Sequence, residues 1–201
     1  MNEKEFKFPS IYEFPPFFTK QPNLSTYNSQ LSIWCKLILE YCKFYKIWQL
    51  NIEGKVISIN DESDETIGLS LPTKIKENSI FENKSINRRL KPDFIKDIIS
   101  ELQRQQHLEF IDNTTNQQQF YIFWYTVEEW SSLILQWIEN TGQQGTVLTL
   151  FELRNSPLSS NQEFHNMDHG VLIKVLNKLV EKKRATIMKD EQNQIVGVKI
   201  I

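Results

Sequence analysis

The stretch DHGVLIKVLNKLVEKKRATIMKDEQNQIVGVKII (168–201) decides the fold, because its hydrophobic period changes once along its length. In the first half, apolar residues recur at helical spacing with lysine, asparagine and glutamate between them, which predicts an amphipathic helix. After Arg184 the pattern alternates through ATIMKD, a turn at EQN and QIVGVKII, which predicts two antiparallel strands. We therefore expect one helix followed directly by one β-hairpin.

The start of this helix is predicted from its capping residues. The Asp168 carboxylate can accept hydrogen bonds from the free N–H groups of a first helical turn. Met167 and Leu172 lie on either side of this cap, at the positions of a hydrophobic staple. The residues expected to face the core are Leu172, Val175, Leu176, Leu179 and Val180.

A second capped helix is predicted upstream. Thr126 and Glu129 form an S/T-x-x-E capping box, Tyr125 and Trp130 can form a staple, and Gly142 is suited to end the helix. The side chains predicted to point inward are Val127, Trp130, Leu133, Ile134, Trp137 and Ile138. A short strand at VLT (147–149) and a short helix at LFELRN (150–155) follow. The order helix, strand, helix, helix, hairpin is that of a winged-helix domain.

The first half of the chain repeats the pattern of a helix before a hairpin. A long helix is expected over Ser25 to Lys46, and Pro92 suits the first turn of a helix in PDFIKDIISELQRQQ. HLEFID and QFYIFWY then predict a hairpin around a polar tip. We therefore predict an α+β fold, mainly helical, with two tandem winged-helix domains, 25–125 and 126–201, behind an extended proline/aromatic arm, 1–24.

Three further predictions concern the middle of the first domain. IWQLNI (47–52) and VISI (56–59) alternate like the strands of a hairpin. The acidic residues 60–79 are expected to form a solvated loop, or a loop regulated by phosphorylation. A short helix is expected over Ile80 to Leu90.

Composition bounds the function more loosely. The chain has 201 residues, 40% of them hydrophobic and 12% aromatic, which can fill real cores. Its formal charge of −2 gives no bulk attraction to nucleic acid or anionic lipid. We expect no membrane span and no signal peptide, because no apolar run is long enough and the first residues, MNEKEFKFPS, are polar. The protein is expected to be cytosolic.

We expect no catalytic centre, cofactor or metal. The sequence contains six glycines in all and no glycine-rich phosphate loop or serine nucleophile elbow. His165 and His169 have the i, i+4 spacing of a zinc pair, but the helix is predicted to begin between them. Cys35 and Cys42 lie about 10 Å apart along one predicted helix, so we expect reduced, buried thiols.

The N-terminal arm combines large apolar side chains with prolines. The apolar residues are Phe6, Phe8, Ile11, Tyr12, Phe14, Phe17 and Phe18, and the prolines are Pro9, Pro15, Pro16 and Pro22. Proline fixes φ and keeps the preceding residue out of the α region, so we expect an extended arm whose rings are presented rather than packed locally. The arm could fold back onto its own domain, or it could dock into an aromatic-lined groove of another subunit.

The cations of the last helix allow three interpretations. Lys174, Lys178 and Lys182 recur every four residues, and Lys183 and Arg184 follow. They could form a DNA-recognition helix, a solvated face whose last turn favours cations, or a surface for an acidic helix of another protein. The acidic wing turn DEQN disfavours the DNA interpretation.

Five stretches carry a resemblance to a known family: YEFPPFFTKQPN (12–23), SIWCKLILEYCKFYKIW (32–48), SLILQWIENTG (132–142), EFHNM (163–167) and RATIMKDE (184–191). In these the chain resembles the small subunits of ESCRT-II, the endosomal sorting complex of the vacuolar protein sorting pathway. The resemblance runs nearly end to end, with the proline-aromatic arm ahead of both predicted domains.

The resemblance implies a non-enzymatic structural subunit that acts in multivesicular body sorting of ubiquitinated membrane cargo. There would be two copies of the chain, and each would dock by its arm onto a winged-helix domain of one of the two larger ESCRT-II subunits. The implied docking residues are Pro9, Tyr12, Phe14, Pro15, Pro16, Phe17 and Phe18. This sequence departs from the family pattern twice, because the first motif has one proline where two are expected, and Phe18 stands where the second motif has tyrosine.

The same resemblance implies that the second domain recruits and nucleates ESCRT-III through its upstream subunit. Lys174, Lys178 and Arg184 are the residues that we expect to contact an acidic helix there. The protein would be cytoplasmic and would reach the endosomal membrane indirectly, through the complex. No nucleic acid partner is expected; the alternative function is that of a tandem winged-helix DNA-binding transcription factor.

Overall fold

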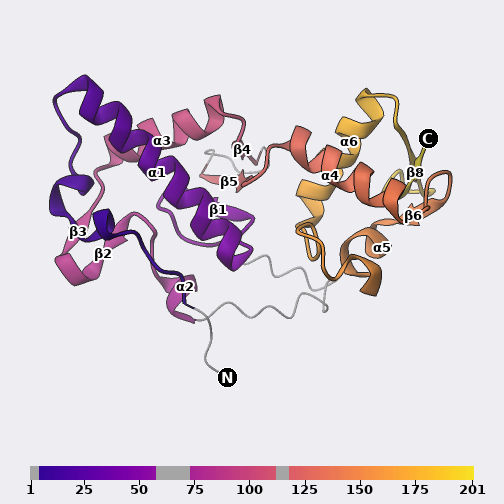
Figure 1. Cartoon of the computed structure of the whole chain (residues 1–201), viewed down its shortest axis with the longest axis horizontal. Coiled ribbons are helices and arrows are strands. Elements are labelled where there is room, and N and C mark those ends of the chain that lie inside the picture. Colours follow the sequence, from indigo (N-terminus) through magenta and orange to yellow (C-terminus); the bar gives the residue numbers. More distant parts are fainter. Residues whose placement is uncertain (1–4, 58–72, 112–117) are drawn as a thin grey trace. The chain divides into compact units, whose positions relative to one another are not determined.

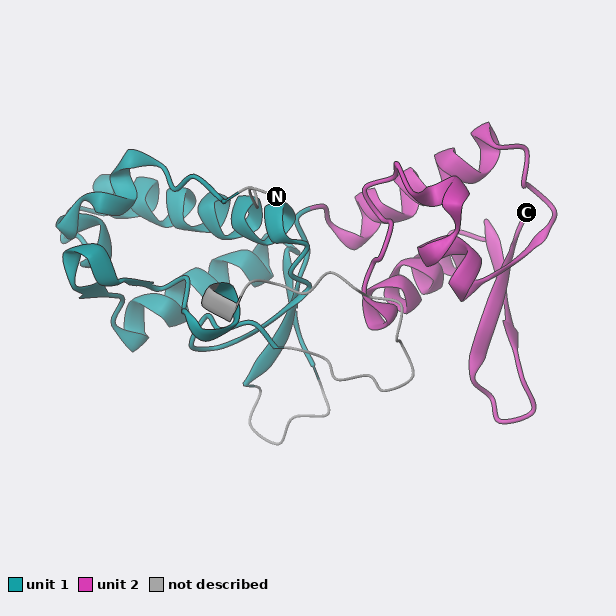
Figure 2. Cartoon of the chain, turned by 90° about the horizontal axis from the view of Figure 1, so that it is seen from below, with its two compact units in different colours: residues 1–63, 69–124 teal, residues 64–68, 125–201 magenta. Residues whose placement is uncertain are grey.

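The chain forms two compact units that divide between Trp124 and Tyr125 (Figures 1 and 2). The structure, a computed structural model, describes residues 5–57, 73–111 and 118–201. In the described residues, more of the chain is helix than strand, and the strands pair antiparallel. This confirms the predicted α+β class.

Unit 1 is built on two long helices and a small sheet. The described elements are η1 (Ser10–Glu13), η2 (Pro15–Phe18), α1 (Leu24–Tyr45), β1 (Gln49–Asn51), α2 (Thr73–Glu77), β2 (Glu82–Asn83), η3 (Lys84–Ile86), β3 (Arg88–Arg89), α3 (Pro92–Arg104), β4 (Leu108–Phe110) and β5 (Gln119–Ile122). One sheet has the order β1-β5-β4, and β2 pairs with β3 in a separate hairpin. Helices α1 and α3 pack against each other.

Both long helices of unit 1 follow the predicted pattern. The Asn23 side chain caps α1 by accepting from the backbone N–H of Thr26, and Pro92 opens α3. The predicted core face of α3 is buried in full: Phe94, Ile95, Ile98, Ile99 and Leu102. The hydrophobic stripe of α1 is wide because the helix packs on α3 and also carries the N-terminal arm, as described below.

Two of the three predictions for the middle of unit 1 were wrong in part. Ile80 to Leu90 is not a helix but the β2–β3 hairpin with η3 inside it, where Asn87 takes a left-handed conformation at φ 50°. Thr73–Glu77 forms α2 within the expected acidic loop, and Ile75 is buried. Leu50 forms an antiparallel bridge with Val56, and the Ile57 N–H donates to the Gln49 carbonyl at 3.2 Å, so the predicted hairpin is confirmed as far as Ile57. Residues 58–59 of the predicted hairpin, residues 60–72 of the acidic loop and the polar tip at 112–117 lie outside the described residues.

Unit 2 contains every element that its sequence predicts. These are α4 (Val127–Asn140), β6 (Val147–Thr149), α5 (Leu150–Asn155), η4 (Pro157–Ser159), α6 (His169–Glu181), β7 (Ala185–Lys189) and β8 (Ile195–Ile200). The sheet has the order β6-β8-β7. Helices α4 and α6 pack together, and α6 leads directly into the β7–β8 hairpin.

The caps of unit 2 explain why its helices begin where they do. Thr126 and Glu129 form both hydrogen bonds of the predicted capping box, and the Asp168 carboxylate accepts from the Val171 N–H at 3.0 Å. Gly142 follows α4 in a left-handed conformation, with φ +67°. Two inward predictions were wrong, because Leu133 and Val180 are both exposed.

Candidate functional site

The N-terminal arm lies on its own unit, which corrects the prediction that its rings are presented to solvent. Tyr12, Phe17 and Phe18 are 3–5% exposed. The arm is also not fully extended, because two 3-10 turns, η1 and η2, fold it into a compact path beside β2 and β3 (Figure 1). Prolines allow this path because each 3-10 turn needs few N–H donors and a φ near that of proline.

Trp34 of α1 is the platform for the buried rings. The Phe17 ring stacks on it at 4.5 Å between centroids and 4° between planes. Phe18 meets the same indole edge-on at 5.3 Å, and Tyr12 packs against Phe18 at 5.3 Å. Burying large rings in this way supplies about 1.5–3 kcal/mol for each side chain. The arm is therefore part of the hydrophobic core of unit 1.

Tyr12 fixes the first half of the arm to the β2–β3 hairpin. Its hydroxyl lies 3.0 Å from the carbonyl oxygens of both Ile80 and Glu82. The Asn83 side-chain amide donates to the Tyr12 carbonyl oxygen at 2.7 Å. Burial, with the negative charge of Glu82, raises the pKa of Tyr12, so the hydroxyl stays protonated and can donate.

Gln30 and Trp34 fix the second half of the arm. The Gln30 side-chain amide donates to the carbonyl oxygens of Phe17 and Thr19 at 2.8 and 3.0 Å, and it lies 3.3 Å from that of Pro16. The Trp34 indole N–H donates to the Phe17 carbonyl at 3.0 Å. Two side chains of one helix thus hold the main chain of the η2 turn.

An ionic contact closes the arm where α1 begins. The Lys20 ammonium lies 2.5 Å from the Asp97 carboxylate of α3, and the Tyr27 hydroxyl donates to the same oxygen at 2.6 Å. Burial acts to raise the pKa of Asp97, but the hydrogen bonds from Lys20 and Tyr27 outweigh it, so the pKa lies below its usual value. Asp97 is therefore ionised at neutral pH.

The arm leaves prolines and two phenylalanines in solvent. Phe14 is 56% and Phe8 is 39% exposed, and Pro9, Pro15 and Pro16 are exposed as well. The seven predicted docking residues therefore split into an anchoring set, Tyr12, Phe17 and Phe18, and an outward set, Pro9, Phe14, Pro15 and Pro16. The sequence does not predict this division. Adjacent aromatic residues in a short 3-10 turn do not recur at a spacing that marks one face as buried.

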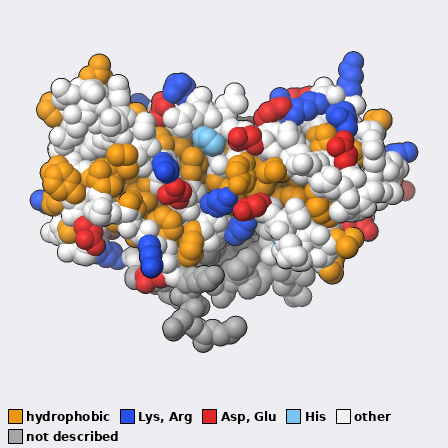
Figure 3. Space-filling view, in the orientation of Figure 1, with side chains coloured by type: hydrophobic (Ala, Val, Ile, Leu, Met, Phe, Trp, Pro, Cys, Tyr) orange, Lys and Arg blue, Asp and Glu red, His pale blue; other side chains and the backbone are white. Residues whose placement is uncertain are grey.

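The predicted cationic site of unit 2 lies where α6 packs against α4. The Lys178 ammonium pairs with Glu181 at 2.9 Å and lies 4.0 Å from Glu128. Arg184 pairs with Glu139 of α4 at 2.6 Å. Lys174 is half-buried on the same helix. On the face in Figure 3, blue and red side chains lie interspersed over unit 2. These cations are therefore largely balanced by carboxylates of their own unit.

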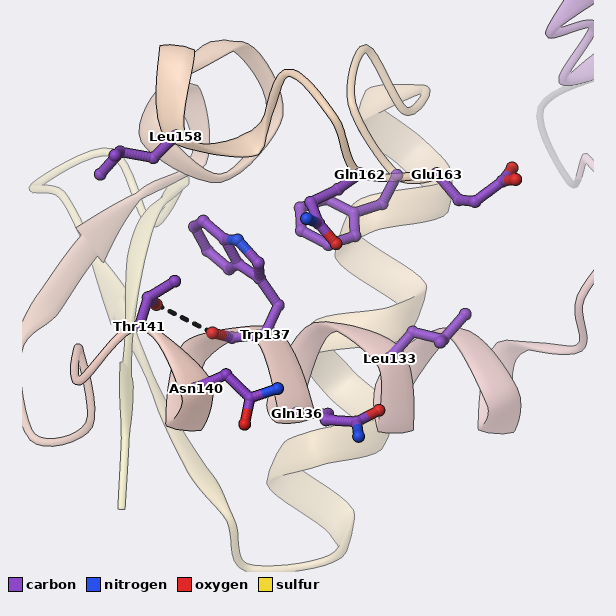
Figure 4. A pocket seen from close by; sticks show the side chains of 9 residues that line it. Leu133, Gln136, Trp137, Asn140, Thr141, Leu158, Gln162 and Glu163 are labelled. Atoms are coloured by element: carbon purple, nitrogen blue, oxygen red, sulfur yellow. Dashed lines mark hydrogen bonds between the residues drawn. The ribbon is translucent and has the colours of Figure 1, made fainter.

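Unit 2 also has a hollow of mixed polarity that the sequence did not predict. It lies between α4 and the segment after α5 (Figure 4). Its apolar walls are Leu133, Trp137, Leu158 and Phe164, and its polar walls are Gln136, Asn140, Thr141, Gln162 and Glu163. Trp137 and Phe164 meet edge-to-face at 5.3 Å. The exposed position of Leu133, which helical periodicity alone assigned to the core, belongs to this hollow.

The cysteines and histidines have structural surroundings. Burial raises the pKa of the Cys35 thiol to about 12 and also raises that of Cys42, so neither is a ready nucleophile. His107 Nδ1 lies 2.6 Å from the Phe123 carbonyl, and His165 Nδ1 lies 3.1 Å from Ser159 Oγ. In the described ranges, no three His, Cys, Asp or Glu side chains gather as a metal would require.

Within the part of the chain that the structure describes, no helix combines the length and apolar character that crossing a bilayer requires.

The family comparison covers most of the chain. Residues 11–168 match the model of the family described as "ESCRT-II complex subunit". The chain is 35% identical over 199 residues to vacuolar protein-sorting-associated protein 25 of Saccharomyces cerevisiae, covering 96% of this chain and 98% of that one. The human protein of the same name is 33% identical over 183 residues, covering 91% and 92% of the two chains.

Solved structures agree with these sequence relatives. The crystal structure of subunit VPS25 of the endosomal trafficking complex ESCRT-II matches with a TM-score of 0.78 at 34% identity, covering 96% of this chain and 98% of that one. A chain in the crystal structure of the endosomal complex ESCRT-II (VPS22/VPS25/VPS36) matches with a TM-score of 0.75 at 33% identity and the same coverage. The expected resemblance is thereby confirmed, and the chain belongs to the ESCRT-II complex subunit family.

Proposed function

We propose that this chain is the VPS25-type structural subunit of an ESCRT-II complex and acts in vacuolar protein sorting without making or breaking bonds. The observation that carries this is the match to VPS25 along nearly the whole chain, in both sequence and fold. We assign it the sorting of ubiquitinated membrane cargo at multivesicular bodies. It would reach the endosomal membrane from the cytoplasm through the complex.

Each unit is proposed to be a winged-helix domain. In unit 1 helix α3 leads into the β4–β5 hairpin, and in unit 2 helix α6 leads into β7–β8, so a helix precedes a two-stranded wing in both. A third strand from earlier in the chain, β1 or β6, completes each sheet. These units would serve as rigid protein-binding modules.

The proposed partners of the arm are the two larger subunits, of the VPS22 and VPS36 type, with two copies of this chain in each complex. A crystal structure of VPS25 with those two proteins supports the choice of partners. The contact would be made by the outward set, Pro9, Phe14, Pro15 and Pro16. Exposed prolines beside an aromatic ring suit an aromatic-lined groove, because their backbone is already ordered.

Unit 2 is the proposed site for the upstream ESCRT-III subunit. Lys174, Lys178 and Arg184 would contact an acidic helix. Its carboxylates would bind Lys178 and Arg184 alongside Glu181 and Glu139, which already pair with these two cations. Replacing the three cations by alanine should weaken binding of the purified ESCRT-III subunit in a fluorescence-polarisation titration. Each exposed ion pair contributes only about 0–1 kcal/mol to stability, so the domain should stay folded. Unchanged affinity would place the site elsewhere on unit 2.

The alternative function, a DNA-binding transcription factor, is not favoured. The comparisons show sorting subunits, and the cations of α6 and its C-terminal end pair with glutamates of α4. A recognition helix needs cations that are free to meet phosphates. Absence of salt-dependent duplex binding by the purified chain would close this alternative.

Co-expression with the two larger subunits tests the proposed docking. The variant Phe14→Ala/Pro15→Ala/Pro16→Ala should lose co-purification, because it removes three of the four residues of the outward set and leaves the anchoring rings in place. Phe151→Ala is the matched control, since Phe151 is 59% exposed on unit 2 and Phe14 is 56% exposed on the arm. Retention of the triple variant in the complex would remove the arm from the proposed interface.

A further inference from the structure

We propose that Gln30 is a positioning residue for the docking face, which is formed by the exposed residues Phe14, Pro15 and Pro16. Gln30 holds the main chain of the arm in place and does not itself belong to this face. This inference rests on the proposed function, because it concerns how the arm is presented to the larger subunits. Tyr12 acts in the same way from the other end of the exposed segment.

Gln30 is placed to select one path of the arm. Its side chain is 5% exposed on α1, and its amide faces the carbonyl oxygens of Pro16, Phe17 and Thr19. The side-chain NH₂ of Gln30 has only two N–H donors. Three carbonyl oxygens therefore lie around one nitrogen and share its two hydrogens. Such convergence requires the backbone of residues 16–19 to turn tightly around it.

The turn that Gln30 holds includes the exposed residues. The Phe17 N–H donates to the Phe14 carbonyl at 2.9 Å, and the Thr19 N–H donates to the Pro16 carbonyl at 3.1 Å. Fixing Phe17 and Thr19 therefore also fixes Phe14 and Pro16, which lie on the solvent side of the same turn.

Tyr12 fixes the segment from the N-terminal side. Its hydroxyl is held at the carbonyls of Ile80 and Glu82, and its own carbonyl accepts from Asn83. The four residues 13–16 are all exposed and run between these two attachments. The exposed segment is thus held at both ends by buried polar contacts to distant parts of unit 1.

Hydrophobic packing alone would not specify this presentation. The stacking of Phe17 and Phe18 on Trp34 drives burial, but apolar contact is non-directional and tolerates neighbouring turns of the chain. Hydrogen bonds to named carbonyls select one turn, because any other leaves a buried donor unsatisfied. A partner then binds a face that is already in its bound conformation. Because most molecules are in this binding-competent conformation, the apparent affinity stays close to the intrinsic affinity.

The test uses the full chain and Gln30→Met, which keeps the length and apolar body of the side chain and removes its donors. Affinity for the co-purified pair of larger subunits, measured by biolayer interferometry, should fall about tenfold, as expected when the competent fraction drops to about one in ten. The amides of Phe17 and Thr19 should also exchange hydrogen faster. Ser131→Ala is the matched control, because it removes a buried hydrogen bond in unit 2 and should leave affinity unchanged.

A double-mutant cycle with Phe14→Ala separates positioning from general destabilisation. If Gln30 acts through Phe14, Gln30→Met should cost much less affinity in the Phe14→Ala background than in the wild type. Additive losses would overturn the proposal, as would full affinity of Gln30→Met. If Gln30→Met does not fold, Tyr12→Phe is used in the same cycle, because it removes a single hydroxyl.

Failure of the proposed function and failure of the positioning role give different results. A wild-type chain that fails to bind the larger subunits would refute the proposed function itself. Normal wild-type binding with additive losses would refute only the positioning role.

Discussion

Phe14 and Phe18 occupy one proline-rich turn, yet the first is 56% and the second 3% exposed. Phe18 packs edge-on against Trp34 and also contacts Tyr12. Phe18→Ala should therefore destabilise unit 1 by about 3–5 kcal/mol through the cavity it leaves, whereas Phe14→Ala should change stability by less than about 0.5 kcal/mol. Urea denaturation followed by tryptophan fluorescence measures both. Equal stability of the two variants would show that the arm is not part of the core.

The Lys20–Asp97–Tyr27 cluster makes the attachment of the arm sensitive to acid. The folded pKa of Asp97 is depressed, so its contribution is complete above the ordinary aspartate pKa of about 3.9 and is lost as the pH falls through the lower folded value. Stability should therefore fall less steeply below about pH 4 in Asp97→Asn than in the wild type. Urea midpoints between neutral and acidic pH measure this. Glu101→Gln is the control, because the hydrogen bond from Arg104 also lowers the pKa of Glu101 but does not involve the arm. If the stability of Asp97→Asn and of the wild type fell equally steeply below about pH 4, Asp97 would not contribute to the acid sensitivity.

Among the elements, those with local start signals could be predicted from sequence, and those made by distant contacts could not. Helices α4 and α6 begin at the predicted caps, because a capping side chain and its N–H partner lie within four residues of each other. The β2–β3 hairpin was missed, because the carbonyls of Ile80 and Glu82 are bound by Tyr12, about 70 residues away. The residues of the proposed docking segment could be recognised by composition, but which of them point outward could not, because Gln30 and Trp34 of α1 bind the main chain of that segment.

Helix α5 offers a test of how much a local cap contributes. Thr149 and Glu152 form a complete capping box at the start of this short helix, and the backbone hydrogen bond from Thr149 lowers the pKa of Glu152. Thr149→Ala should destabilise the protein by about 1 kcal/mol. Thermal denaturation of the variant measures this, with Ser132→Ala on the exposed face of α4 as the control. An unchanged midpoint would mean that packing of Leu150 and Leu153 alone fixes the helix.

At the scale of the whole molecule, the arm and unit 2 are proposed to have different partners, and the structure gives each its own support. The hydrogen bonds and the ion pair described for the arm are made with residues of unit 1. Unit 2 has a separate core around Trp130, Ile134, Val171 and Val198, all fully buried. We therefore expect residues 125–201 to fold alone, with Tyr125 retained because it packs on Trp130 at 5.0 Å.

This fragment should unfold cooperatively in urea, bind the upstream ESCRT-III subunit, and fail to co-purify with the two larger ESCRT-II subunits. The physical reason is that its sheet, β6-β8-β7, and its packed helices α4 and α6 are complete within the fragment, whereas every residue proposed to dock is absent. A fragment beginning at Thr146 is the control, since it loses α4 and with it the partners of Lys182 and Arg184; it should show no cooperative transition. Co-purification of residues 125–201 with the larger subunits would instead assign the docking surface to unit 2.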